Sequence, residues 1–271
     1  MPRFTVDIAT QVAGPQDRPR LLAWITTGAA AGLLAVGPLA LASSTWLSWR
    51  WFWAVLAGLA VCATALNLRW VPHVERIGPP PLRSRPPVQR ILGPLSFAAV
   101  LFVGATAYFT YAADSAVRGG LGPAAGPVVF TPVGLAGLSG LWTGTLVRRL
   151  RPGPLAACSL VLTAASLALL AVGSGSPTAV LGSALIFGSA NTVGSAVLPI
   201  WAALRAPEQP AAAFSAALVT GSVCAVVTPV VTGAVAEHVS LGPPLLIAAL
   251  LCLTTAAALA AVPGSRAHRP G

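Results

Sequence analysis

Residues 148–173 read RRLRPGPLAACSLVLTAASLALLAVG, and this stretch decides the fold class. Arginines and prolines precede an uncharged run rich in alanine, leucine and valine. The run has about the 20 residues that an α-helix needs to cross a hydrocarbon layer of about 30 Å. Strands of a membrane barrel would instead alternate in polarity over segments of about 10 residues. The stretch therefore predicts a transmembrane helix that begins next to a group of arginines.

Seven other apolar stretches of similar length occur along the 271-residue chain. The eight stretches cover approximately residues 21–42, 51–68, 92–113, 124–144, 155–173, 178–201, 211–235 and 242–262. The composition agrees, because 8% of the residues are charged and the mean hydropathy is +0.81, whereas soluble domains carry about 25% charged residues. The sequence predicts an all-α polytopic membrane protein with eight transmembrane helices.

The arginines predict the orientation of these helices. All 16 basic residues are arginines, and all but Arg50 and Arg118 lie in alternate gaps that include both termini. Arginine is retained in cytoplasmic loops during membrane insertion, so both termini are expected in the cytoplasm. The net charge of +10 then lies close to the membrane, where anionic lipid is its expected partner. Nucleic-acid binding is not expected.

A proline- and arginine-rich segment divides the chain. Residues 69–91 contain a triple proline that cannot be helical, and they are expected to form a cytoplasmic linker. Two helices, in residues 21–68, precede the linker and six helices, in residues 92–262, follow it. Residues 1–20 lack the compact apolar core of a cleavable signal. They are expected to form a cytoplasmic amino-terminal segment, and residues 263–271 a cytoplasmic tail.

Glycine and proline recur inside the apolar stretches. Examples are GLLAVGP at 32–38, GPVVFTPVG at 126–134, GSANTVGSA at 188–196 and TPVVTG at 228–233. Small residues let helices approach closely, and prolines kink them. Two interpretations fit: helices that rock between states, or the general frequency of small residues in membrane helices.

Residues 17–53, DRPRLLAWITTGAAAGLLAVGPLALASSTWLSWRWFW, resemble a segment of the major facilitator superfamily, especially of its drug:proton antiporter branches. The segment is similar to the loop before the fifth helix, the fifth helix and the start of the sixth. The residues that carry the resemblance are the loop arginine, the glycine-proline motif and the start of the sixth helix, namely Arg18, Gly28, Gly32, Gly37, Pro38 and Arg50. The resemblance implies a gating role for these positions.

The resemblance continues through the rest of the chain. Residues 120–150 are similar to the eighth helix and its flanking loops. There Gly144 and Arg149 fit a short basic signature, and Arg148 stands where the family has aspartate. Residues 211–235 are similar to the eleventh helix. The chain therefore resembles the last eight of twelve helices, which implies a partner that supplies the missing helices, a gene start placed too late, or a decayed transporter.

Polar and aromatic residues within the helices are candidates for a substrate cavity. They are Asn191, Thr192, Tyr108, Tyr111 and Thr131. Asn191 and Thr192 form the most interior polar pair, and either a cavity or an interhelical hydrogen bond explains them. Trp24, Trp142 and Trp201 are expected to anchor the protein at the membrane interface.

Ionisable residues near the helix ends are candidates for proton coupling. Asp114 follows an aromatic cluster at the outer end of the third helix, and Glu237 and His238 end the seventh. Ionisable groups within the bilayer are often functional. The alternatives are an interfacial acid at Asp114 and a solvated helix end at Glu237 and His238.

No motif predicts an enzyme, a metal site or a cofactor, because neither a P-loop nor metal-ligand spacing occurs. The four cysteines lie in apolar stretches and are expected to pack rather than to form disulfides. The predicted function is secondary transport of small molecules across the cell membrane, with efflux of hydrophobic compounds coupled to protons. The alternative is an inactive or partner-dependent membrane protein.

Overall fold

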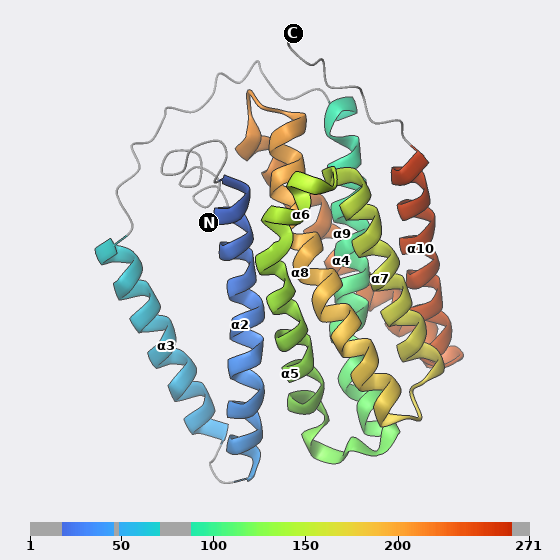
Figure 1. Cartoon of the computed structure of the whole chain (residues 1–271). Helices are drawn as coiled ribbons and strands as arrows, with labels where there is room; N and C mark the ends of the chain where they lie inside the picture. The colour runs from blue at the N-terminus through green and yellow to red at the C-terminus, as the bar shows by residue number, and fades with distance from the viewer. Residues whose placement is uncertain (1–17, 46–48, 71–87, 262–271) are drawn as a thin grey trace.

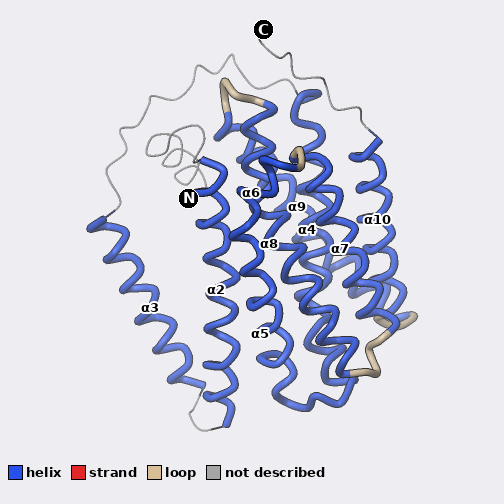
Figure 2. Tube along the Cα trace, viewed as in Figure 1, coloured by secondary structure: helices blue, strands red, loops and turns tan. Residues whose placement is uncertain are grey.

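The computed structural model describes residues 18–45, 49–70 and 88–261, and helices account for almost all of this part (Figures 1 and 2). Within the described residues, eight helical spans are long and apolar enough to cross a bilayer. The same residues contain no strand. The predicted all-α class and the predicted eight helices are therefore confirmed, and the chain is a multi-pass membrane protein.

Several of the spans consist of more than one helical element. The elements are α2 (Arg18–Thr45), α3 (Trp49–Trp70), α4 (Val88–Ala116), η1 (Val117–Leu121), η2 (Gly122–Ala124), α5 (Ala125–Gly137), η3 (Leu138–Trp142), α6 (Thr143–Arg149), α7 (Pro152–Val172), α8 (Pro177–Arg205), α9 (Pro210–His238) and α10 (Gly242–Ala261). Because α3 ends at Trp70 and α4 begins at Val88, both ends of the expected 69–91 linker are helical. Its centre, residues 71–87, lies outside the described part, as do the residues expected in the amino-terminal segment before residue 18 and in the tail after residue 261.

Proline marks both the beginnings and the bends of the helices. Pro152, Pro177 and Pro210 are the first residues of α7, α8 and α9, a position at which proline costs no helical hydrogen bond. Inside α5 and α9, Pro132 and Pro229 each follow a threonine. An interior proline removes one backbone donor and bends the helix.

The preceding threonines bond back to the chain beside these prolines. Thr131 Oγ1 donates to the Pro127 carbonyl over 2.7 Å, and Thr228 Oγ1 donates to the Cys224 carbonyl over 2.7 Å. Back-bonding of this kind also bends helices. Helices α5 and α9 thus share the same local feature, an interior proline preceded by a threonine that bonds back to the chain.

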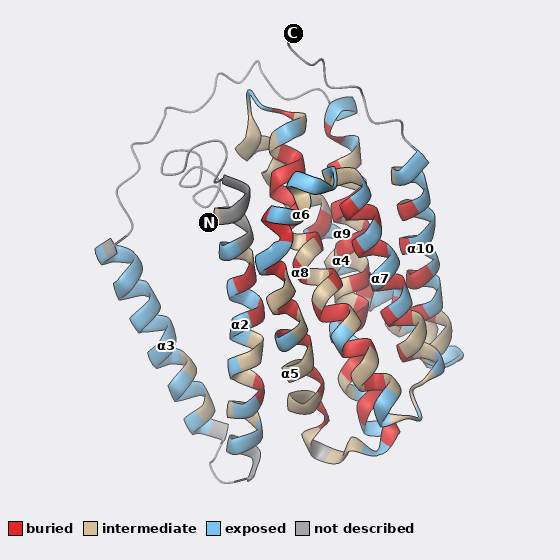
Figure 3. Cartoon of the chain, in the orientation of Figure 1, coloured by how far each residue is buried: buried red, intermediate tan, exposed pale blue. Residues whose placement is uncertain are grey.

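Helix α4 lies at the centre of the bundle. It packs against α9 and also touches α5, α7, α8 and α10, while α7 packs between α8 and α10. The core is formed mainly by α4, α7 and α8 (Figure 3). In it the Tyr108 ring stacks on the Phe187 ring at a centroid distance of 3.8 Å.

Trp201 is part of this core, and the expectation of an interfacial anchor at this position is wrong. Its side chain is 5% exposed and packs against Phe97. A Cβ at Gly93 would lie 2.9 Å from the indole, so glycine on α4 makes room for the ring. Trp24 and Trp142, in contrast, are 57% and 64% exposed.

Helices α2 and α3 lie at one edge of the bundle (Figure 1). Helix α2 packs against α5, η3, α6 and α8, whereas α3 packs against α2. The described side chains of α3 are exposed nearly along its whole length (Figure 3). Its apolar surface suits contact with lipid.

Candidate functional site

Glycines bring α2 and α5 into backbone contact. A Cβ at Gly134 of α5 would lie 2.8 Å from the Ala30 carbonyl oxygen of α2 and would also meet Leu34. On the other side, Gly37 of α2 lies against Thr131, whose Oγ1 occupies the space that a Cβ would need. Only glycine allows helices to approach so closely.

The same line of contacts continues onto α8. A Cβ at Gly137 would lie 2.7 Å from both the Ala30 Cβ and the Thr192 Oγ1, and one at Gly140 would lie 2.7 Å from the Thr27 Oγ1. On α8, Gly188 lies against the backbone of Val133. We call Gly37, Gly134, Gly137, Gly140 and Gly188 the glycine seam. The seam joins α2, α5, η3 and α8 and is closed.

A short 3₁₀ segment, η3, interrupts the span at the seam, between α5 and α6. Such segments in the middle of a helix often mark hinges. Ser139 within this segment and Thr143 directly after it have buried hydroxyl oxygens without a hydrogen-bond partner. Buried hydroxyls normally have hydrogen-bond partners, so the hydrogen-bonding capacity of these two groups is unfilled.

The motif residues divide between the seam and the surface. Gly28 and Gly32 have open space around the position of a Cβ, and Pro38 is exposed. Arg50 and Arg149 are exposed near helix ends, and Gly144 is buried in α6. Arg18 begins α2, but its side chain lies outside the described part. Gly37 is the motif residue that enters the glycine seam.

The substrate-cavity candidates occupy two places. Thr192 is 7% exposed and packs into the glycine seam, where Thr131 also lies, and Asn191 is half-buried beside Thr192. Tyr108 and Tyr111 lie instead on α4, where both hydroxyl groups bond to other helices. Thr131 lies against Gly37, whereas Thr192 lies against Gly137 and Gly140, at another part of the seam. The structure therefore places these two threonines along one seam without bringing them into contact, and the tyrosine hydroxyls contact Ser183 and Thr232 instead.

The two tyrosines connect α4 to α8 and α9. The hydroxyls of Tyr108 and Ser183 are 3.1 Å apart, and those of Tyr111 and Thr232 are 2.9 Å apart. Thr232 Oγ1 also donates to the Thr228 carbonyl over 2.7 Å. Both tyrosine rings are buried. In this structure the two tyrosines connect neighbouring helices.

Sequence reasoning selected the tyrosines but missed their partners. The hydrogen-bond partners Ser183 and Thr232 lie 75 and 121 positions from their tyrosines, so no local spacing pairs them. Phe187, which stacks on Tyr108, is equally remote in the sequence. The four-residue spacing between Thr228 and Thr232 puts both on one helix face, which is a local signal for a polar stripe on α9.

The proton-coupling candidates lie at one end of the bundle. Asp114 is near the end of α4, and Glu237 and His238 end α9, which packs beside α4 in the same direction (Figure 1). Asp114 Oδ2 pairs with Arg118 Nη2 at 3.0 Å, with both side chains about half exposed. Glu237 and His238 are exposed. An exposed pair of this kind contributes little to stability.

Within the described residues, no three His, Cys, Asp or Glu side chains gather in a way that could hold a metal ion. The seam offers hydroxyls and apolar surface instead. Such a surface can contact an uncharged or hydrophobic solute, and it can change its packing without breaking ion pairs. Apolar spans, a seam of small residues and interior prolines together define a polytopic helical membrane protein with closely packed helices.

Comparison with known proteins names the family. The family model described as "Uncharacterised MFS-type transporter YbfB" matches residues 4–261. The chain belongs to this family of major facilitator transporters. A search of the curated proteins finds no match.

Proposed function

We propose that the protein moves small hydrophobic molecules out of the cell by alternating access across the glycine seam. In this proposal α2 separates from α5 and α8, and the opened path exposes Thr131, Asn191 and Thr192 to the solute. The observation that carries the proposal is the seam itself, where backbones touch without a charged or large side chain between them. In this proposal the segment between α3 and α4 is the cytoplasmic linker between the two parts that move.

The local structure of the span on the α5 side supports this motion. The Thr131–Pro132 pair precedes the seam glycines of α5, and the 3₁₀ segment η3 contains Gly140. The unpartnered hydroxyls of Ser139 and Thr143 gain partners when η3 rearranges. The hydroxyl and apolar lining favours a hydrophobic solute over a multiply charged one, because a buried charge needs a partner.

A disulfide across the seam tests the proposal. In a chain whose native cysteines are replaced by alanine, Ala30→Cys and Gly137→Cys are combined, since their Cβ positions are neighbours. The readout is ethidium transport in proteoliposomes under an imposed proton gradient. Oxidation is expected to stop transport and reduction to restore it. Transport that continues through the oxidised pair would contradict the proposal.

A second disulfide serves as the matched control. Gly173→Cys and Ala179→Cys also face each other closely, but they bridge the turn between α7 and α8, away from the seam. Its oxidation is expected to leave transport within about twofold of the reduced protein, because a crosslink within a short local turn constrains little. The single variants account for the effect of each cysteine alone.

We also propose that protons drive the transport and that Asp114, Glu237 and His238 carry them at the outer end. The support is their common position at the ends of α4 and α9. Asp114→Asn and Glu237→Gln are expected to uncouple ethidium movement from the proton gradient, while exchange of ethidium without a gradient persists. Unchanged proton-driven uptake in both variants and in His238→Gln would remove these residues from the coupling path.

The second candidate is a chain that transports only together with a partner polypeptide that supplies further helices. The observation in its favour is the bare face of α9, where Val219, Val223, Val226 and Val230 are 59–71% exposed. This face packs against none of the described helices, whereas α2 covers α5. If the chain alone is inactive in proteoliposomes while membranes of producing cells transport ethidium, this candidate is favoured.

A further inference from the structure

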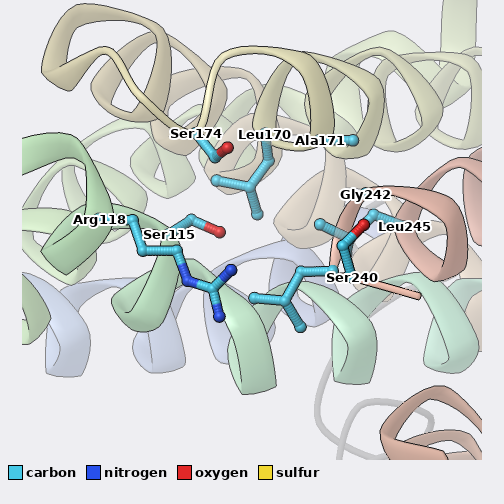
Figure 4. Close-up of a pocket in the computed structure, with 9 residues that line it drawn as sticks. Ser115, Arg118, Leu170, Ala171, Ser174, Ser240, Gly242 and Leu245 are labelled. Atoms are coloured by element: carbon cyan, nitrogen blue, oxygen red, sulfur yellow. The ribbon is translucent and has the colours of Figure 1, made fainter. Parts of the chain in front are cut away.

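A cavity of about 160 Å³ lies at the end of the bundle that is predicted to face outward. Residues from the end of α4, from η1, from the end of α7 and from the start of α10 line it. Figure 4 shows Arg118, Ser115, Ser174 and Ser240 around this space, together with Leu170. The cavity is separate from the glycine seam, and no predicted site residue lines it.

Ser115 is the first indication of a ligand. Its side chain is 1% exposed, and its Oγ is buried without a hydrogen-bond partner. Figure 4 shows this hydroxyl directed toward the space between α4 and α7. A buried hydroxyl without a partner needs an explanation, and a bound group with acceptor oxygens supplies one.

Arg118 adds a positive charge on the same side of the chain. It follows Ser115 by three positions and lines the cavity, with its guanidinium pointing inward (Figure 4). One guanidinium nitrogen, Nη2, holds Asp114. A guanidinium has five N–H donors in a fixed plane, so donors remain for a second anion beside Asp114.

The other walls are held in place by close backbone contacts. A Cβ at Gly119 would lie 3.2 Å from the Ser174 carbonyl oxygen, which fixes the α7–α8 turn against η1. Gly242 begins α10 and lines the cavity with Leu245, so the positive end of a 20-residue helix faces it. Pro243 and Pro244 have no N–H, and the donors therefore come mainly from side chains.

We infer that this cavity binds a phosphate group. The donors are the hydroxyls of Ser115, Ser174 and Ser240 and the guanidinium of Arg118, and they approach from several elements. A tetrahedral oxyanion has acceptor oxygens in as many directions, whereas a carboxylate is planar. The phosphate comes either from a phospholipid headgroup of the outer leaflet or from a free anion in solution.

Asp114 competes with the ligand for Arg118. When phosphate enters, the guanidinium is shared between the carboxylate and the phosphate, and two negative charges lie close together. Removing the carboxylate charge should therefore strengthen binding. Substitution of Arg118 should weaken phosphate binding and substitution of Asp114 should strengthen it, although both break the same ion pair. A general effect on folding would change binding in the same direction in both variants.

The test measures binding by the purified full chain. One arm titrates inorganic phosphate by calorimetry. The other adds phosphatidylglycerol to the delipidated protein and measures the lipid that it retains in native mass spectrometry. Arg118→Gln is expected to weaken binding at least about tenfold, as for loss of a charge-assisted hydrogen bond. Ser115→Ala should weaken binding severalfold and Asp114→Asn should strengthen it. Arg149→Gln, at the opposite end, is the matched control and should leave binding unchanged.

The two arms identify the source of the phosphate. Binding of inorganic phosphate assigns a soluble anion, and retention of the lipid alone assigns a headgroup; both support the site. Absence of binding in both arms, or binding that is the same in Arg118→Gln and Ser115→Ala as in the unaltered chain, would overturn the inference. Since transport is not measured, the result is independent of the proposed function.

Discussion

Single hydroxyl groups connect helices that are far apart in the sequence. Tyr111 joins α4 to α9 through Thr232, and Tyr108 joins α4 to α8 through Ser183. In a bilayer, hydrophobic burial does not favour one helix partner over lipid. Specific hydrogen bonds and close packing therefore determine which helices meet. These two tyrosines are expected to fix the position of α4 relative to its neighbours.

A double-mutant cycle on Tyr111 and Thr232 tests this role. Tyr111→Phe and Thr232→Val each remove one side of the 2.9 Å contact. The coupling free energy is expected to be about 0.6 kcal/mol, the average for hydrogen bonds between membrane helices. It is measured by reversible unfolding in mixed detergent. A cycle that closes at zero would mean that the contact does not stabilise the fold.

Helix α5 places its glycines in two different environments. Gly134 touches the backbone of α2, whereas Gly126, in the first turn of the same helix, has open space where a Cβ would stand. Replacement of glycine by alanine favours a helix by up to about 1 kcal/mol when nothing obstructs the methyl group. Replacing Gly126 therefore measures the intrinsic helix preference alone, whereas replacing Gly134 also measures the effect of the contact with α2.

Gly134→Ala is expected to destabilise the protein by about 1–3 kcal/mol, as for an overpacked core. Gly126→Ala should leave the stability unchanged or slightly higher. Thermal unfolding of both variants in detergent gives the comparison. If the two variants unfold at the same temperature, the distance between the α2 and α5 backbones at Gly134 is larger than in this structure.

On the scale of the whole molecule, the arginines follow the direction of the helices. Arg69, Arg90, Arg149 and Arg205 lie at the end of the bundle where α2 begins and α10 ends. Arg118 lies in η1, directly after the end of α4, and therefore at the opposite end. The segregation agrees with cytoplasmic termini and an outward-facing Arg118, which the positive-inside rule predicts.

Cysteine labelling in intact cells checks this orientation. In a chain without its native cysteines, Arg118→Cys is expected to react with a membrane-impermeant maleimide from outside. Arg149→Cys should react only after the cells are permeabilised. The cysteine-free chain gives the background. Labelling with the opposite pattern would invert the orientation.

The sequence was sufficient for the fold class and for the number of spans, because apolar length alone determines both. The contacts within the site were not predictable to the same degree. Gly37 was selected from its motif, but Gly28 and Gly32 belong to the same motif and lie at the surface. Which side of a helix meets a neighbour depends on the rotation of the helix, and an almost uniformly apolar helix carries little sequence signal for it. The partners of Tyr108 and the cavity beside Ser115 depend on such long-range packing.

The contact between Ala30 and Gly134 has a consequence for biosynthesis. Roughly 100 residues separate the two positions, and at about 5–20 residues per second the ribosome needs roughly 5–20 s to synthesise them. During this interval α2 is in the bilayer without the helix against which it packs. Its small-residue face is then open to lipid and to other nascent helices. The seam closes only after α5 and α8 have been inserted, so an insertion factor that shields α2 would act in that interval.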